Sequence, residues 1–190
     1  MVATYLKAEI SSARFSADVK EAMRTFGVEE SAITHPDLTS GRENALRAKV
    51  LGAYRGYGRN REMFEGVPDH LTWYEAELTR AEIGNLRYVD YSYWNELTDN
   101  THMVKDGVKN IRKGKVVFGV SNDRFLTFAE KVRNGEYEVE PMILWGQNIA
   151  STPEILEGHL RATAFGLAGE KAPATTHVLI GLVHAPESPC

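Results

Sequence analysis

The clearest pattern of hydrophobic and polar positions lies between residues 142 and 169. The apolar run at 142–145 fits a buried strand, and the pair Ile155-Leu156 fits a second short strand that ends at Glu157. The period then becomes helical, with apolar positions at i, i+4, i+7 and i+8 before a glycine that can end the helix. These residues are Leu160, Ala164, Leu167 and Ala168, followed by Gly169. The pattern predicts two strands and then a helix that opens at Gly158-His159-Leu160-Arg161.

The start of this predicted helix is a candidate anion site. Gly158 stands at the turn into the helix, where the first backbone N–H groups lack intrahelical acceptors and the helix dipole is positive. Arg161 can add a bidentate fork to phosphate oxygens, and His159 can add a second donor whose charge depends on pH. A plainer interpretation stays open, in which Gly158 caps a packing helix and His159 and Arg161 are ordinary surface residues.

The N-terminal part of the chain has mainly helical patterns. A helix is expected at 16–27 with Ser16 as its cap, and another is expected from Gly41. The inward face of the second helix is expected to hold Ala45, Ala48 and Leu51. The tyrosine- and arginine-rich segment 54–61 is either a flexible lid over an anionic ligand or a plain surface loop.

The remaining patterns complete an α+β fold. Strands are expected at 71–78 and 177–183, and helices at 79–86 (capped by Thr79), 104–111 and 123–134. We therefore expect a helical N-terminal extension over residues 1–70, joined through 65–69 to a second domain over residues 71–190.

A family resemblance rests on the C-terminal motif. A strand, the sequence Glu-Gly-His-Leu-Arg-Ala at 157–162, a helix and the strand at 177–183 together resemble the C-terminal half of the ParB/sulfiredoxin-like fold. The resemblance extends, more weakly, back to about Glu77. In that superfamily a Gly-His-x-Arg or Gly-Glu-Arg-Arg element at a helix start binds nucleotide phosphates, so the resemblance implies that Gly158, His159 and Arg161 bind a nucleotide.

Within the superfamily, the motif is most similar to the branch of free-serine-kinase-type enzymes. That resemblance implies nucleotide-dependent phosphoryl transfer to a small hydroxyl-bearing metabolite, with ATP or another nucleotide and Mg²⁺ as cofactors. Such chemistry requires positioning and charge neutralisation around the phosphates, together with a carboxylate that accepts the hydroxyl proton. Sulfiredoxin chemistry requires a cysteine just before the motif histidine, and Gly158 occupies that position here.

The carboxylate base is expected in the segment 85–98. Asp90 lies among aromatic residues, which would raise the pKa of its carboxyl group if it were buried. Glu96 is the second candidate, and Glu157 can instead hold a metal or orient His159. The neighbouring aromatic residues are Tyr88, Tyr91, Tyr93 and Trp94, and an ordinary hydrophobic core explains them equally well.

Charge and composition narrow the choice of partners. The net charge of −4 gives no overall attraction to nucleic acid, and the six histidines show no metal-ligand spacing. The single cysteine, Cys190, excludes a disulfide framework, and no apolar run reaches the length of a membrane span or a signal peptide core. We expect a cytoplasmic protein with a small-molecule substrate and no membrane partner. The oligomeric state stays open.

A basic stripe supports the alternative function. Lys105, Lys109 and Arg112 share one face of the helix expected at 104–111, where they can follow a phosphate backbone or simply face solvent. The alternative is a non-catalytic ParB-like regulator that binds nucleotide or DNA. The acidic net charge and the lack of a recognisable helix-turn-helix favour the enzyme.

Overall fold

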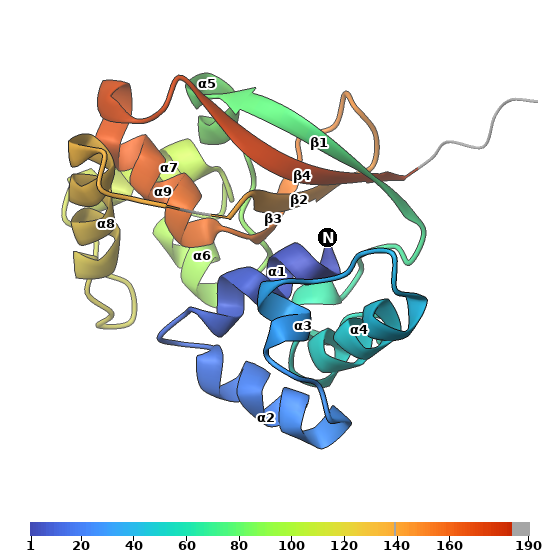
Figure 1. Cartoon of the computed structure of the whole chain (residues 1–190). Coiled ribbons are helices and arrows are strands. Elements are labelled where there is room, and N and C mark those ends of the chain that lie inside the picture. The colour runs from blue at the N-terminus through green and yellow to red at the C-terminus, as the bar shows by residue number, and fades with distance from the viewer. Residues whose placement is uncertain (139, 184–190) are drawn as a thin grey trace, which may run out of the picture. The chain divides into compact units, whose positions relative to one another are not determined.

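The computed structural model describes residues 1–138 and 140–183 (Figure 1). The chain divides into two compact units, residues 1–69 and residues 70–190. The first unit contains only helices, whereas the second holds the whole sheet. From the sequence, we expected the boundary between the N-terminal extension and the second domain at 70/71, one residue from the division between the two units.

The first unit consists of four α-helices and a short 3-10 helix. They are α1 (Val2–Ile10), α2 (Ser16–Phe26), α3 (Ser31–Thr34), α4 (Gly41–Arg55) and η1 (Glu62–Phe64). Helix α2 ends as predicted at Gly27, whose φ of 62° suits a left-handed cap. The expectation that Ser16 caps α2 is wrong, because Ser16 is the first helical residue and Phe15 occupies the cap position.

Helix α4 buries Leu51 as expected, but it also buries a charged residue that the expected inward face of Ala45, Ala48 and Leu51 did not include. Ala45 is exposed, whereas the side chain of Arg47 is only 1% exposed. The Arg47 guanidinium donates hydrogen bonds to the carbonyl oxygens of Ala32 and Asp37, both at 2.8 Å, and pairs with Glu43. A buried charge is tolerated when its donors are satisfied in this way.

A second buried charge holds α1 against α4. Arg55 forms an ion pair with the buried Glu9, and the Tyr54 hydroxyl donates to the same carboxylate at 2.8 Å. The Arg55 guanidinium also lies 3.7 Å from the centre of the Phe15 ring. The lid interpretation is therefore wrong for Tyr54 and Arg55, which end α4 and bind within their own unit.

The second unit contains a mixed four-stranded sheet. Its strands are β1 (Leu71–Thr79), β2 (Met142–Gly146), β3 (Glu154–Glu157) and β4 (Thr175–Val183), in the order β1-β4-β2-β3. Strand β4 is antiparallel to β1 and parallel to β2, and β3 is antiparallel to β2. The α+β class and the four predicted strands are confirmed.

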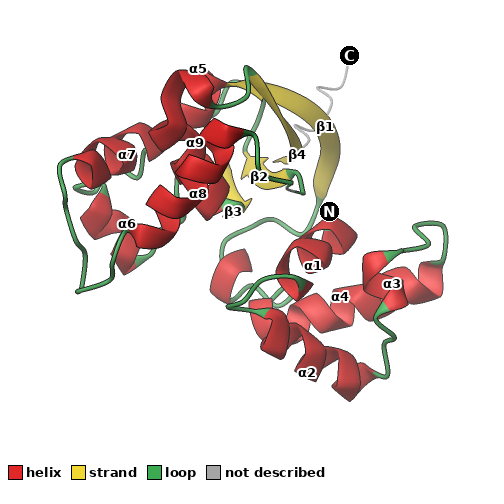
Figure 2. Ribbon diagram, turned by 60° about the vertical axis from the view of Figure 1, so that its left-hand side comes forward, coloured by secondary structure: helices red, strands yellow, loops and turns green. Residues whose placement is uncertain are grey.

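The helices of this unit are α5 (Arg80–Gly84), α6 (Ser92–Leu97), α7 (Val104–Arg112), α8 (Asp123–Asn134), α9 (His159–Ala168) and the 3-10 helix η2 (Gly169–Lys171). The expected capping role of Thr79 is confirmed by a reciprocal capping box with Glu82. Helices α5, α7 and α8 surround α9 (Figure 2).

Helix α9 is buried on most of its circumference, not only on the predicted apolar face. Close packing against α7 depends on Gly166, where an added Cβ would lie 2.6 Å from Val108 Cγ2. Arg112 of α7 donates hydrogen bonds to the carbonyl oxygens of Gly166 and Leu167 near the end of α9. These contacts fix α9 and hence the position of its first turn.

Candidate functional site

The turn from β3 into α9 requires a glycine. Gly158 is the N-cap residue and has a φ of +108°, in a region that side-chain-bearing residues rarely adopt. A Cβ at this position would lie 2.6 Å from Cγ of Met142 in β2. The N-cap residue makes no side-chain capping hydrogen bond. The start of a helix is a place where proteins commonly bind anions.

Arg161 lies in the first turn of α9 but is already engaged. Its side chain is 7% exposed, forms an ion pair with Glu157 and donates a hydrogen bond to the carbonyl oxygen of Glu140. Burial lowers the pKa of the guanidinium to about 10. Arg161 therefore ties the end of β3 to the segment that enters β2, and Glu157 offsets its charge.

His159 projects from the opposite side of the helix. His159 lies two positions before Arg161, which corresponds to a rotation of about 200° around the helix axis. The His159 ring stacks on Trp94 at 5.3 Å between centroids and 13° between planes, and Trp94 stacks on Tyr88 at 4.1 Å and 9°. The first turn thus has an aromatic side and a buried charged side.

The backbone of α9 is tied to this aromatic stack. The hydroxyl groups of Tyr88 and Thr163 lie 2.7 Å apart, and the Thr163 hydroxyl donates to the carbonyl oxygen of His159 at 2.7 Å. Burial raises the pKa of Tyr88 well above its ordinary value, so its hydroxyl keeps its proton. Tyr88 therefore belongs to the hydrophobic core, as one of the two interpretations of the aromatic residues expected. The stack positions the His159 ring.

The three candidate carboxylates occupy different surroundings. Asp90 is exposed and accepts a hydrogen bond from Asn95 Nδ2 at 2.7 Å, so the burial expected from its aromatic neighbours is not found. Glu96 is also exposed and lies 3.5 Å from Lys115 Nζ. Glu157 is occupied by Arg161. Asp90 is linked to the segment of the His159 stack through its hydrogen-bond partner Asn95, which directly follows Trp94.

Glu154 is a half-buried carboxylate that sequence reasoning missed. It begins β3, and the Trp145 indole donates to it at 3.3 Å. Burial raises the pKa of Glu154; the charges of Arg87 and His102 oppose this shift, and that of Asp90 adds to it. Arg87 reaches Glu154 through an isolated backbone bridge. That long-range pairing has no signal in the local sequence.

A strained loop supplies His102 to the same cluster. Asp99, Asn100 and His102 have positive φ values of 55°, 63° and 61°. The Thr98 hydroxyl accepts a hydrogen bond from the backbone N–H of His102 at 3.0 Å, which holds the loop in place. Such backbone strain is frequent at functional sites.

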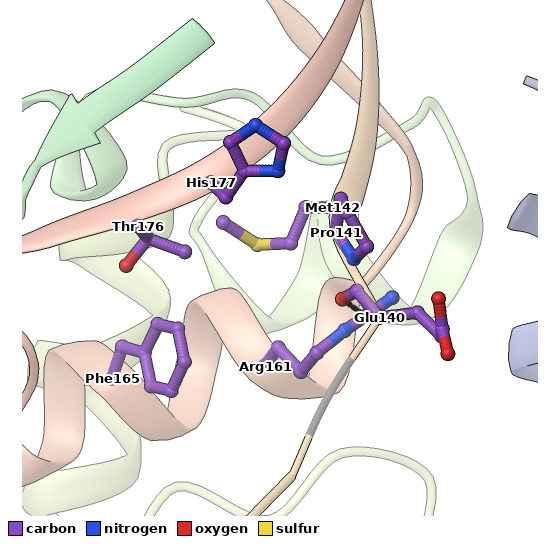
Figure 3. Close-up of a pocket in the computed structure, with 7 residues that line it drawn as sticks. All are labelled: Glu140, Pro141, Met142, Arg161, Phe165, Thr176 and His177. Atoms are coloured by element: carbon purple, nitrogen blue, oxygen red, sulfur yellow. Dashed lines mark hydrogen bonds between the residues drawn. The ribbon is translucent and has the colours of Figure 1, made fainter. Parts of the chain in front are cut away.

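A small cavity lies on the Arg161 side of α9. Figure 3 shows the Arg161 side chain running along one wall, with Met142 and Phe165 among the apolar lining. The lining residues are Glu140, Pro141, Met142, Arg161, Phe165, Thr176 and His177. Its volume of about 180 Å³ is smaller than a drug-sized ligand requires. A nucleotide would therefore have to bind outside it, in front of the helix.

Searches of protein-family models, curated proteins and solved structures found no match to this chain. In the described part of the chain, no group of three or more histidine, cysteine or acidic side chains is arranged to hold a metal ion. Among the same residues, no helix is long and apolar enough to cross a membrane.

Proposed function

We propose that residues 71–190 form a ParB/sulfiredoxin-like domain that binds nucleotide phosphates at the start of α9 and transfers a phosphoryl group to a small hydroxyl-bearing metabolite. The observation that carries the proposal is the Gly158 turn, where a close approach to Met142 and a φ of +108° admit only glycine. The order β2, β3, α9, β4 with Gly158-His159-Leu160-Arg161 at the turn supports the family assignment.

The first turn of α9 supplies the phosphate site. Its backbone N–H groups and the positive end of the helix dipole favour a bound anion. The stacked His159 ring is fixed beside this turn and can donate to a phosphate oxygen when protonated. Arg161 acts differently from the sequence expectation, because it stabilises the turn through Glu157 and Glu140 and contributes a partly offset positive charge.

Asp90 is the proposed general base. Its carboxylate is exposed and fixed by Asn95, so a substrate hydroxyl can reach it. A base at this position accepts the hydroxyl proton as the oxygen attacks the terminal phosphorus, and the bond to the bridging oxygen breaks to release the nucleotide with one phosphate fewer. ATP or another nucleotide supplies the phosphoryl group. Mg²⁺ would be carried by the nucleotide phosphates, because such ions keep several water ligands and need few ligands from the protein.

The second candidate function is a nucleotide-binding regulator without catalysis. Two observations favour it: Asp90 is not buried, and Glu157 already offsets the charge of Arg161. Both candidates use the same phosphate site, and only the enzyme requires Asp90.

Titration of the full chain with ATP, ADP and CTP, with and without Mg²⁺, tests the binding site. We expect micromolar affinity for at least one nucleotide. Arg161→Ala should weaken it at least about tenfold through loss of charge and of the fixed turn. Glu157→Gln separates the two causes, because it removes the ion pair with Arg161 but leaves the guanidinium in place. Absence of nucleotide binding would refute both candidate functions.

Phosphoryl transfer is then assayed across a panel of amino acids and hydroxylated metabolites. Asp90→Asn should lower turnover about 10²–10⁴-fold and leave nucleotide affinity unchanged. Glu96→Gln should retain activity. Nucleotide binding without turnover on any acceptor would favour the regulator over the enzyme.

A further inference from the structure

The connection between α7 and α8, which can be followed in Figure 1, carries an exposed apolar patch. The patch consists of Val116, Phe118 and Val120 in the connection and Leu126 in the first turn of α8, with exposed fractions of 57%, 69%, 46% and 44%. The first three alternate along the chain, with Phe118 in a tight turn and the two valines on either side of it. Exposed apolar groups clustered in this way indicate an interaction site.

The turn holds Phe118 in an unfavourable conformation. Residues 117–120 form a two-residue turn, in which the N–H of Val120 donates to the carbonyl oxygen of Val117 at 2.9 Å. Phe118 and Gly119 have φ values of +52° and +72°, the pattern in which Asn-Gly is preferred. Gly119 suits its position, whereas a bulky residue with positive φ is an outlier. Phe118 is both strained and exposed, which indicates a role in binding and not in stabilising the fold.

The patch is held rigidly. Val117, between two patch residues, is 1% exposed and belongs to the main core. The side chain of Asn122 is buried and donates to the carbonyl oxygen of Lys115 at 2.7 Å, which closes the connection at its base. The apolar side chains are therefore presented on a fixed support.

The segment of the chain that carries the patch is basic. Residues 104–134 carry eight Lys or Arg against three Asp or Glu, a net charge of +5 in a chain whose net charge is −4. Lys109 and Lys113 are exposed at the end of α7, just before the turn. An apolar tip with a basic surround fits a partner that has a negative surface over an apolar interior.

We infer that the 116–126 patch docks this protein on an anionic phospholipid bilayer, with Phe118 entering the headgroup region. Such a surface contact requires no membrane-spanning helix. A tight turn with three apolar side chains offers much less area than the roughly 800 Å² per partner of a stable protein interface. A bilayer accepts a small apolar tip together with basic groups, because each contributes separately to binding. The inference is independent of the nucleotide site.

Sedimentation of the full chain with phosphatidylcholine vesicles, with and without phosphatidylglycerol, tests the inference. We expect binding only to the anionic vesicles, and weaker binding as salt rises. Phe118→Asn should weaken vesicle binding at least about fivefold. Because Asn suits the turn, the same variant should melt at an equal or higher temperature, by up to about 2–4 °C. Ile149, 93% exposed outside residues 104–134, provides the control Ile149→Asn, which should bind as the unmodified chain does.

Other results would overturn the inference. These are no binding to anionic vesicles, unchanged binding by Phe118→Asn, or an equal loss in Ile149→Asn. A gel shift of duplex DNA that depends on Phe118 would assign the patch to nucleic acid instead. A dimer in solution that Phe118→Asn dissociates would assign it to a second copy of the chain.

Discussion

Replacing Gly158 by alanine tests whether the turn into α9 depends on a residue without a side chain. A φ of +108° is unfavourable for alanine and costs about 1–3 kcal/mol. The new Cβ would also lie 2.6 Å from Met142 Cγ and 3.1 Å from Met142 Cβ. Met142 is 1% exposed and cannot move into solvent, so this overlap costs roughly a further 1–3 kcal/mol. We expect Gly158→Ala to lower the free energy of unfolding by about 2–6 kcal/mol.

Urea unfolding measures this loss, and two further variants separate its causes. Gly135→Ala introduces Cβ at another positive φ, +73°, where nothing described lies within 4 Å, so only the backbone term of about 1–2 kcal/mol should appear. In a Met142→Ala background the overlap is relieved, and Gly158→Ala should cost at least about 1 kcal/mol less than in the unmodified chain. A loss below about 0.5 kcal/mol for Gly158→Ala, or no coupling to Met142, would refute the steric argument.

Three further predictions concern charged groups. Arg55→Met should destabilise the first unit by about 3–5 kcal/mol in urea unfolding, because it leaves the buried Glu9 unpaired; a loss under 1 kcal/mol would contradict this. The raised pKa of Glu154 means that the folded state binds the proton more tightly, so stability falls as pH rises from the ordinary carboxyl pKa to the raised one. Glu154→Gln should remove that slope in unfolding measured from about pH 4 to 7, while Asp90→Asn should not abolish it. Arg112→Ala should lower stability by about 1 kcal/mol through loss of its bonds to the end of α9, whereas Lys109→Ala should leave it unchanged; equal effects would show that Arg112 belongs only to a solvated stripe.

Features determined by neighbouring residues were predictable from the sequence. Gly27 ends α2, and Thr79 and Glu82 start α5, because left-handed caps and capping boxes need only the residues of one turn. The change from strand to helix at Gly158 followed from periodicity in the same way. Helices α1 and α6 were not predicted, and the six residues of α6 are too few to show a period.

Features determined by distant residues were not predictable. Arg47 and Arg55 resemble solvated helix residues until the carbonyl groups and the carboxylate that satisfy them are known. The same holds at the candidate site, where Arg161 meets Glu140 and Asp90 remains exposed beside a buried aromatic stack. The surroundings of Glu154 depend on an isolated β-bridge that pairs it with the distant residue Arg87. Each case depends on tertiary contacts that override the local pattern.

The most direct test of the central claim is an NMR titration of the backbone amides of the full chain with Mg²⁺-nucleotide. If phosphates bind at the start of α9, the amide signals of His159 and Leu160 should shift in a saturable way. The indole signal of Trp94 should follow through the His159 stack. Gly135 is the C-cap residue of α8, at the end of a different helix, so its amide signal should not shift. Saturable binding that leaves His159 and Leu160 unshifted would contradict the proposal.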